Sequence, residues 1–336
     1  MSLNTLEEIA SYIVSDGKGI LAADESNPTC TKRFDTIGVE STEESRRDYR
    51  EMLFRSGGIQ GNIGGVILFD ETIRQNAKDG TSLVDLMNSQ GALPGIKVDK
   101  GLQPIGDSDE TVTVGLDGLD ERLKEYSLLG AKFTKWRAVI KIGNNLPTDN
   151  CIDANMKALA DYAKVVQDNG MVPMVEPEVL MEGDHSIEEC FTATERSLKS
   201  LFHHLKENGV NIKGTILKPN MVTSGSTCSN QASINEVAEQ TLECLKANVP
   251  SELPAITFLS GGQSELLATA HLDAMNKISG FDWKLSFSFG RALQAPTLKA
   301  WMGKPENVFI AQDALSHRAK MNQLAALGQW DKGLED

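Results

Sequence analysis

Lys218 is the side chain best placed for covalent chemistry, because it directly follows the apolar run Gly214–Leu217. An amine attacks a carbonyl only in its neutral form, and an apolar pocket or a second nearby cation lowers the pKa of a lysine. Lys135, inside the apolar run Phe133–Ile140, is the candidate for that second cation. A lone lysine at the edge of such a run is more often a solvated surface group. The two lysines therefore indicate amine chemistry on a carbonyl only if the fold brings them together.

Carboxylates end two other apolar runs. Asp24 follows Lys18–Ala22, and Glu176 and Glu178 follow Met171–Val175. Each of them alone is explained equally well as a helix cap or as the partner of a surface arginine. Nearly every apolar run in the chain ends in charged or polar side chains, however, and that coincidence favours a shared site.

Basic side chains and glycines at further run ends predict an anion site. Lys135 and Arg137 lie two residues apart, so a strand directs both to one face, where a bound anion would compensate two buried cations. The segment Ser260–Gly262 follows the run Ala255–Leu259, and glycines there let backbone N–H groups approach a phosphate. Arg291, after the run Lys284–Phe289, supplies charge for it. Alone, the two glycines indicate no more than a tight turn.

Other common site chemistries lack their motifs. The chain has neither a Walker P-loop nor a G-x-G-x-x-G between a strand and a helix, and it has no G-x-S-x-G elbow. None of the five histidines lies at the end of an apolar run, although metal-dependent hydrolysis or aldol cleavage usually needs histidine ligands. We therefore expect an enzyme without a metal and without a cofactor.

These residues need a scaffold that brings the ends of many strands together. Apolar, β-branched or aromatic runs alternate with segments of helical period, and no composition break divides the chain. The predicted strands are Lys18–Ala22, Gly65–Phe69, Gly95–Val98, Phe133–Ile140, Met171–Val175, Gly214–Leu217, Ala255–Leu259 and Lys284–Phe289. The predicted helices include Thr42–Phe54, Asp153–Gln167, Ile187–Leu205, Ser233–Leu245 and Ser264–Ile278, and Ser233 with Glu236 can form a capping box.

Eight such units favour a closed (β/α)8 TIM barrel of the α/β class, with an open doubly wound sheet as the alternative. We expect residues 1–336 to form a single domain with an N-terminal helix and a C-terminal helical segment. Active sites of these barrels lie at the carboxyl ends of the strands, and alternate strands share layers. Lys135 and Lys218, on the fourth and sixth predicted strands, can therefore lie close together.

Composition limits the partners. The 336 residues carry a formal net charge of -14, which repels nucleic acid and anionic lipid, although a few cations in a cleft can still attract an anionic substrate. The chain start lacks a secretory pattern, and no transmembrane run follows. The cysteines form an odd, widely spaced set, which indicates reduced thiols and a cytoplasmic protein. We expect neither a nucleic-acid nor a membrane partner.

Several longer segments resemble class I fructose-bisphosphate aldolases, in the family's order and from about Gly17 to Trp330. They are Gly17–Ser26 (GKGILAADES), Gly64–Phe69 (GGVILF), Gly95–Gly101 (GIKVDKG), Lys135–Arg137 (KWR), Val175–Glu178 (VEPE), Leu217–Val222 (LKPNMV), Phe258–Glu265 (FLSGGQSE) and Gly290–Gln294 (GRALQ). The resemblance implies a (β/α)8 barrel and reversible, metal-independent cleavage of fructose 1,6-bisphosphate to dihydroxyacetone phosphate and glyceraldehyde 3-phosphate. A preference for fructose 1-phosphate or sedoheptulose 1,7-bisphosphate is a related expectation, and a silent sugar-phosphate-binding barrel is the alternative of another class.

The resemblance also implies a role for each matching residue. Lys218 matches the Schiff-base lysine, Glu176 the general acid and base, Glu178 its supporting carboxylate, Asp24 a residue that orients the substrate, and Lys135 one that assists proton movement. The residues implied to bind the substrate are Lys97 and Arg137 for the second phosphate, Ser260, Gly261, Gly262, Ser288, Gly290 and Arg291 for the C1 phosphate, and Lys32, Arg33 and Thr29 for further contacts. The family implies a homotetramer.

Three positions depart from the family pattern. Thr29 stands where many members have serine, and Phe289 stands where tyrosine is common. Animal members end in a mobile tail with a terminal tyrosine that assists proton exchange, whereas this sequence ends at Asp336 without one. We therefore expect a different or slower proton transfer after cleavage.

Overall fold

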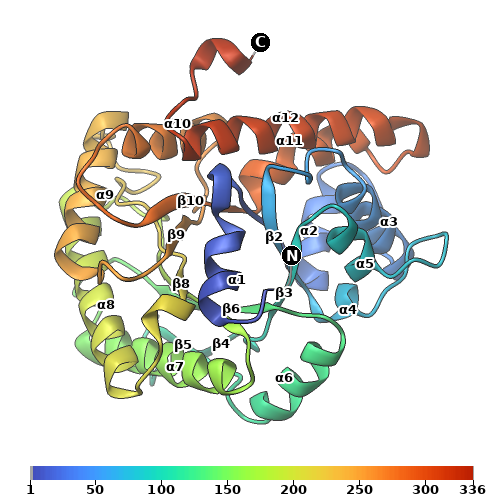
Figure 1. Ribbon diagram of the computed structural model, residues 1–336. Helices are drawn as coiled ribbons and strands as arrows, with labels where there is room; N and C mark the ends of the chain where they lie inside the picture. Colours follow the sequence, from blue (N-terminus) through green and yellow to red (C-terminus); the bar gives the residue numbers. More distant parts are fainter. Residues whose placement is uncertain (1–2, 336) are drawn as a thin grey trace.

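Eight parallel strands close into a barrel in the computed structural model, which describes residues 3–335 (Figure 1). The barrel strands are β1 (Gly19–Ala23), β2 (Ile63–Leu68), β3 (Leu93–Lys97), β6 (Phe133–Ile140), β7 (Val172–Val179), β8 (Ile216–Leu217), β9 (Ala255–Phe258) and β10 (Lys284–Phe289). Their order around the barrel is β1-β10-β9-β8-β7-β6-β3-β2. The predicted (β/α)8 barrel is confirmed, and the doubly wound alternative is wrong because β1 pairs with both β2 and β10.

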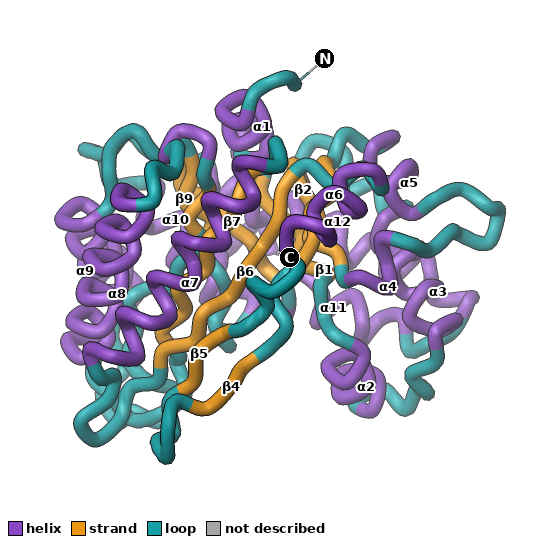
Figure 2. Tube along the Cα trace, turned by 90° about the horizontal axis from the view of Figure 1, so that it is seen from below, coloured by secondary structure: helices purple, strands orange, loops and turns teal. Residues whose placement is uncertain are grey.

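Helices follow the strands and surround the barrel (Figure 2). They are α2 (Asn27–Asp35), α3 (Glu43–Phe54), α4 (Asp70–Ile73), α5 (Leu83–Ser89), α6 (Leu119–Leu128), α7 (Asp149–Asp168), α8 (Ile187–Glu207), α9 (Ile234–Asn248), α10 (Glu265–Asn276), α11 (Arg291–Trp301) and α12 (Val308–Ala326). The capping box of Ser233 and Glu236 starts α9 as predicted. Helix α7 begins four residues before the predicted start because Thr148 accepts a hydrogen bond from the Cys151 N–H and caps it.

The amino end of the barrel is closed by α1 (Leu6–Ile13). Ile9 and Ile13 pack in one apolar cluster with Phe133, Met174 and other strand side chains. The approach is close, since a Cβ built on Gly64 would lie 2.0 Å from the Ile13 carbonyl oxygen. Glycine is therefore required at that position of β2, and α1 fills the end of the barrel opposite the carboxyl ends of the strands.

An unpredicted hairpin of β4 (Leu102–Pro104) and β5 (Thr111–Thr113) lies between β3 and α6. The Thr113 hydroxyl donates a hydrogen bond to the Arg137 carbonyl oxygen at 2.7 Å, so the hairpin supports β6 near its carboxyl end. Figure 2 shows the hairpin and α1 at opposite ends of the barrel. Four short 3-10 segments complete the elements: Ser15–Gly17, Ile212–Gly214, Pro305–Asn307 and Lys332–Glu335.

Of two further expectations, one can be compared with the described residues. Among residues 3–335, none of the helices combines the length and the apolar character that a bilayer crossing needs. The other expectation concerned the end of the sequence, where a terminal tyrosine is missing. That end, Asp336, lies outside the residues that the structure describes.

Candidate active site

A cavity of about 890 Å³ opens at the carboxyl ends of the barrel strands. Almost all of the residues predicted for the site line it: Asp24, Thr29, Arg33, Lys97, Lys135, Arg137, Glu176, Glu178, Lys218, Ser260, Gly261, Ser288, Gly290 and Arg291. Lys32 and Gly262 do not. The fold therefore brings together, from seven different strand ends, residues that are far apart in the sequence.

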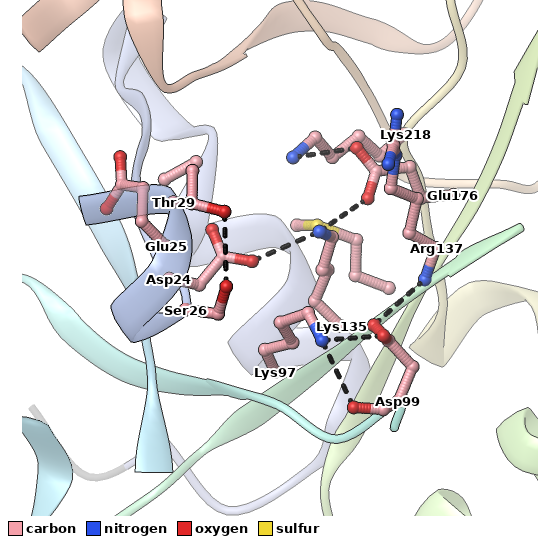
Figure 3. A network of polar contacts seen from close by, with 12 residues as sticks. Asp24, Glu25, Ser26, Thr29, Lys97, Asp99, Lys135, Arg137, Glu176 and Lys218 are labelled. Atoms are coloured by element: carbon pink, nitrogen blue, oxygen red, sulfur yellow. Dashed lines mark hydrogen bonds and ion pairs between the residues drawn. The ribbon is translucent and has the colours of Figure 1, made fainter. Parts of the chain in front are cut away.

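Glu176 lies between the two lysines at the base of this cavity (Figure 3). Its Oε1 is 3.0 Å from Lys218 Nζ, and its Oε2 is 2.8 Å from Lys135 Nζ. All three side chains are buried. Lys135 and Lys218 therefore lie close together, as predicted, and both contact the same carboxylate. Glu176 can exchange protons with either amine.

The charges of this group follow from its contacts. Burial raises the pKa of Glu176, but Lys135 and Lys218 outweigh it and hold that pKa below its usual range. Burial likewise raises the pKa of Asp24, and Lys135, Lys218 and Lys97 bring it down to about 2. Burial lowers the pKa of Lys135, yet Asp24, at 3.1 Å, and Glu176 raise it overall. Lys135 is therefore a cation between two carboxylates.

This arrangement corrects one expectation. Lys135 and Arg137 were predicted to be buried cations that need a bound anion, and the structure compensates both with protein carboxylates. Arg137 forms an ion pair with Glu178, and part of its side chain is exposed at the cavity mouth. The expectation was wrong because β7 places a carboxylate near each cation: Glu176 and Glu178 lie two residues beyond the register partners of Lys135 and Arg137.

A second group at the mouth includes a residue with no predicted role. Asp99 Oδ1 is 2.6 Å from Lys97 Nζ, and Asp99 Oδ2 accepts a hydrogen bond from the Arg137 N–H at 3.4 Å. Asp99 thus holds the Lys97 side chain and the backbone of Arg137, the two residues that were predicted to bind the second phosphate. Its place two residues after Lys97 on the same strand end was the available sequence signal.

The turn after β9 forms another part of the cavity wall. Gly261 and Gly262 have φ of 58° and 97°, which side chains other than glycine rarely adopt. Gly262 faces Arg291, since a Cβ there would lie 3.3 Å from Arg291 Nη2. The Ser288 hydroxyl is buried and has no hydrogen-bond partner among the described residues. A buried hydroxyl at a cavity wall is suited to bind a ligand oxygen.

Lys32 lies outside this cavity. It lines a neighbouring cavity of about 590 Å³ on the α2 and α11 side. Thr29, Arg33 and Arg291 line both cavities, so they connect the two.

Behind β1, a buried network that sequence reasoning did not assign holds the end of the strand. Glu25 Oε2 is 2.8 Å from Arg50 Nη2, and Glu25 also pairs with Arg33. The Gln294 amide donates hydrogen bonds to Glu25 Oε1 at 2.8 Å and to the Ala22 carbonyl oxygen at 2.7 Å. Arg50 carried no signal, because helical period alone does not distinguish an inward arginine from a surface one.

Metal ligands do not gather in the same way. Within residues 3–335, no group of three or more His, Cys, Asp and Glu side chains has an arrangement that could hold a metal ion.

Known proteins resemble this chain over nearly its whole length. The family described as fructose-bisphosphate aldolase class-I matches residues 5–336. A probable fructose-bisphosphate aldolase class 1 of Xanthomonas axonopodis pv. citri is 53% identical over 332 residues, which cover 98% of this chain and 99% of that protein. The cytosolic fructose-bisphosphate aldolase 4 of Arabidopsis thaliana is 51% identical over 321 residues, covering 95% and 82%.

The solved structure of a fructose-bisphosphate aldolase from Plasmodium falciparum, in complex with TRAP and a small-molecule inhibitor, has a TM-score of 0.96. It is 47% identical in sequence, and the match covers 98% of this chain and 95% of that one. Fold, sequence and the family match therefore agree, and the chain belongs to the class I fructose-bisphosphate aldolase family.

Proposed function

We propose that this chain cleaves fructose 1,6-bisphosphate reversibly at the cavity described above, and that Lys218 forms the Schiff base with the substrate. One observation carries the assignment of the residue: the Lys218 amine lies 3.0 Å from a carboxylate oxygen of Glu176, and both side chains are buried at the base of the cavity. A buried amine next to a proton acceptor is the arrangement that nucleophilic amine catalysis needs.

In the proposed reaction the Lys218 amine attacks the C2 carbonyl of the ketose and forms a carbinolamine. Glu176 takes up and returns the protons as water leaves and the iminium forms. The iminium then accepts the electron pair of the breaking C3–C4 bond, while Glu176 removes the C4 hydroxyl proton. Glyceraldehyde 3-phosphate leaves first, and the enamine is protonated and hydrolysed to release dihydroxyacetone phosphate.

The neighbouring charged groups support this role. Lys135, paired with Asp24 and Glu176, helps protons and charge move and stabilises negative charge that develops near C4. Asp24 stays ionised and can orient a substrate hydroxyl. Glu178 orients Arg137 through their ion pair.

The two phosphates would bind at opposite sides of Lys218. We assign the C1 phosphate to the turn after β9 and to the end of β10, where the unpaired Ser288 hydroxyl favours it. The residues of this assignment are Ser260, Gly261, Gly262, Ser288, Gly290 and Arg291. Lys97 and Arg137 would bind the second phosphate, with Thr29 and Arg33 as further contacts. Lys32 has the least support, because it lines only the neighbouring cavity.

We further propose that residues 1–336 form one domain and that the protein is a cytoplasmic homotetramer without nucleic-acid or membrane partners. Support for the tetramer and the compartment comes from the resemblance to the family, in which the Arabidopsis relative is named cytosolic.

Reduction with borohydride during turnover tests the proposed function. The enzyme is treated with borohydride in the presence and in the absence of fructose 1,6-bisphosphate, and modified peptides are located by mass spectrometry. We expect a substrate-dependent adduct on Lys218 that EDTA does not change, and none at that position in a Lys218→Arg variant. Binding of the sugar without any adduct would instead support a silent sugar-phosphate-binding barrel.

A further inference from the structure

A buried histidine on α10 contacts the turn that carries the proposed C1-phosphate site. His271 Nδ1 is 2.6 Å from the Oε1 of Gln263, which directly follows the turn Ser260–Gly262. Only 3% of His271 and 8% of Gln263 is exposed. Neither residue is used in the proposed mechanism, and no other charged or polar side chain contacts the ring within hydrogen-bond distance in the described structure.

Gln263 links this histidine to two functional segments. Its backbone N–H donates a hydrogen bond to the Ser260 carbonyl oxygen at 3.0 Å, which closes the turn. Its side-chain amide donates to Met221 Sδ at 3.5 Å, and Met221 lies three residues after Lys218. Gln263 therefore lies between the glycine turn and the segment that follows the Schiff-base lysine.

These contacts determine which atom of the ring carries the proton. Because the Gln263 amide nitrogen donates to Met221, its oxygen is left to accept, and His271 Nδ1 must be the donor. His271 Nε2 is then the bare nitrogen, and it is buried without a hydrogen-bond partner among the described residues. A second proton there would have no acceptor, and burial lowers the pKa of His271 to about 4. The ring is thus a neutral donor with one fixed direction.

The glycine turn needs such a contact. Gly261 and Gly262 have no side chains, and their positive φ values belong to a conformation that glycine leaves easily. A rigid contact at the next residue reduces the number of conformations in which the turn's N–H groups miss the phosphate.

We propose that His271 is a positioning residue for phosphate binding: by fixing Gln263, its neutral ring holds Ser260–Gly262 in the conformation that binds the C1 phosphate. This proposal rests on the proposed function, because the turn is assigned to the C1 phosphate there. A merely structural role of His271 would instead weaken the fold and affect all substrates alike.

Two ketoses that differ only in the phosphate separate these roles. Dihydroxyacetone phosphate and dihydroxyacetone can each form a Schiff base with Lys218, and borohydride trapping gives the half-saturating concentration of each. In His271→Leu, which removes the donor, we expect that concentration to rise about fivefold for dihydroxyacetone phosphate, the loss of one buried hydrogen bond. For dihydroxyacetone it should change less than twofold. His271→Gln keeps an N–H donor and should restore most of the affinity.

Two more variants complete the test. Thr269→Ala removes a different buried hydrogen-bonding side chain from α10, one that contacts Arg318 and Asn322, and should leave the ratio of the two half-saturating concentrations unchanged. Gln263→Met, of similar size, removes the same link from the other side and should reproduce the selective loss even if His271→Leu does not fold.

The outcomes that contradict the proposal are distinct. An equal rise for both ketoses, or no rise for either, would overturn the positioning role while leaving the Schiff-base assignment intact. Absence of a Lys218 adduct with both ketoses in the unmodified enzyme would instead overturn the proposed function.

Discussion

Glu176 decides how the two lysines of this site can act. One carboxylate contacts Lys218 with one oxygen and Lys135 with the other, so a proton that leaves the Lys218 amine has an acceptor at 3.0 Å. The cationic Lys135 keeps Glu176 ionised until that proton arrives, because the positive charge favours the carboxylate. In the proposed reaction the three residues would act as one proton-transfer group, and the effects of substitutions in it should not be additive.

Asp24 makes the acid stability of the protein testable at a single residue. Its pKa in the folded protein, about 2, lies below the usual value of 3.8 because Lys135, Lys218 and Lys97 outweigh the effect of burial. The ionised form therefore stabilises the fold at any pH above about 4, and this contribution is lost as the pH falls towards 2. A shift of this size corresponds to roughly 2.5 kcal/mol.

The variant Asp24→Asn should have a free energy of unfolding lower by about 2 kcal/mol at pH 7, with the same difference at pH 5 and about half of it at pH 3. Urea unfolding at the three pH values measures this. Asp149→Asn, at an exposed carboxylate on α7, is the control and should show no such dependence. A difference that stays constant down to pH 3 would mean that Asp24 does not titrate in this way.

At the residue scale, the sequence predicted which candidate side chains share the cavity better than it predicted their partners. Lys218, Glu176 and Asp24 follow apolar runs and Lys135 lies within one, and the barrel rule brings the carboxyl ends of those strands together. The buried pair of Glu25 and Arg50 could not be predicted, because the contact joins a strand end to a helix face and depends on how that helix packs. Lys32 was placed wrongly for a related reason: it lines only the neighbouring cavity, whereas the adjacent Arg33 lines both, and this difference depends on how α2 packs.

At the element scale, long apolar runs were predicted most accurately. The bounds of β6 and β10 agree with the prediction, since both strands carry aromatic and aliphatic side chains and are nearly fully buried. Strand β7 extends to Val179 beyond the predicted end, because Glu176 and Glu178 interrupt the apolar run while their side chains stay paired inside the barrel. The hairpin of β4 and β5 was missed because β4 is short and exposed, so no hydrophobic pattern marks it.

The packing of α1 on β2 gives a prediction for an element far from the chemistry. Gly64→Ala would place a Cβ 2.0 Å from the Ile13 carbonyl oxygen, and backbone must move to relieve that overlap. We expect the free energy of unfolding to fall by about 3 kcal/mol, as overpacking does in other cores. Activity per folded molecule should hold, because Gly64 lies near the amino end of β2, opposite the cavity.

Denaturant unfolding together with specific activity separates the two effects for Gly64→Ala. Gly57→Ala is a matched control, because a Cβ there meets no atom within 4 Å, and its stability should change by less than about 0.5 kcal/mol. An unchanged stability in Gly64→Ala would show that α1 shifts without cost, and α1 would then not be a fixed part of the barrel core.

For the whole molecule, the charged residues of the main cavity have the opposite balance to the chain as a whole. The chain has a net charge of -14, yet nine lysines and arginines and only seven aspartates and glutamates line the main cavity. The sequence indicated that local charge would matter, since cations end several apolar runs. It could not indicate how many cations would be paired, because the pairing depends on how β7 lies against β6, as in the ion pair of Arg137 with Glu178.

This distribution predicts how salt affects the proposed reaction. Raising sodium chloride from 50 to 500 mM shortens the Debye length from roughly 14 to roughly 4 Å. In the proposed binding mode the cavity cations contact the substrate phosphates directly, whereas the excess negative charge is spread over a surface of 13878 Å². Salt should therefore weaken the attraction more than the repulsion and raise the KM for fructose 1,6-bisphosphate about fivefold, with kcat changed less than twofold.

Fructose 1-phosphate, which lacks the second phosphate, should show a smaller rise in KM. Initial-rate measurements across this range decide the matter: a KM that falls with salt would mean that the repulsion by the whole chain, and not the local cations of the cavity, dominates substrate binding.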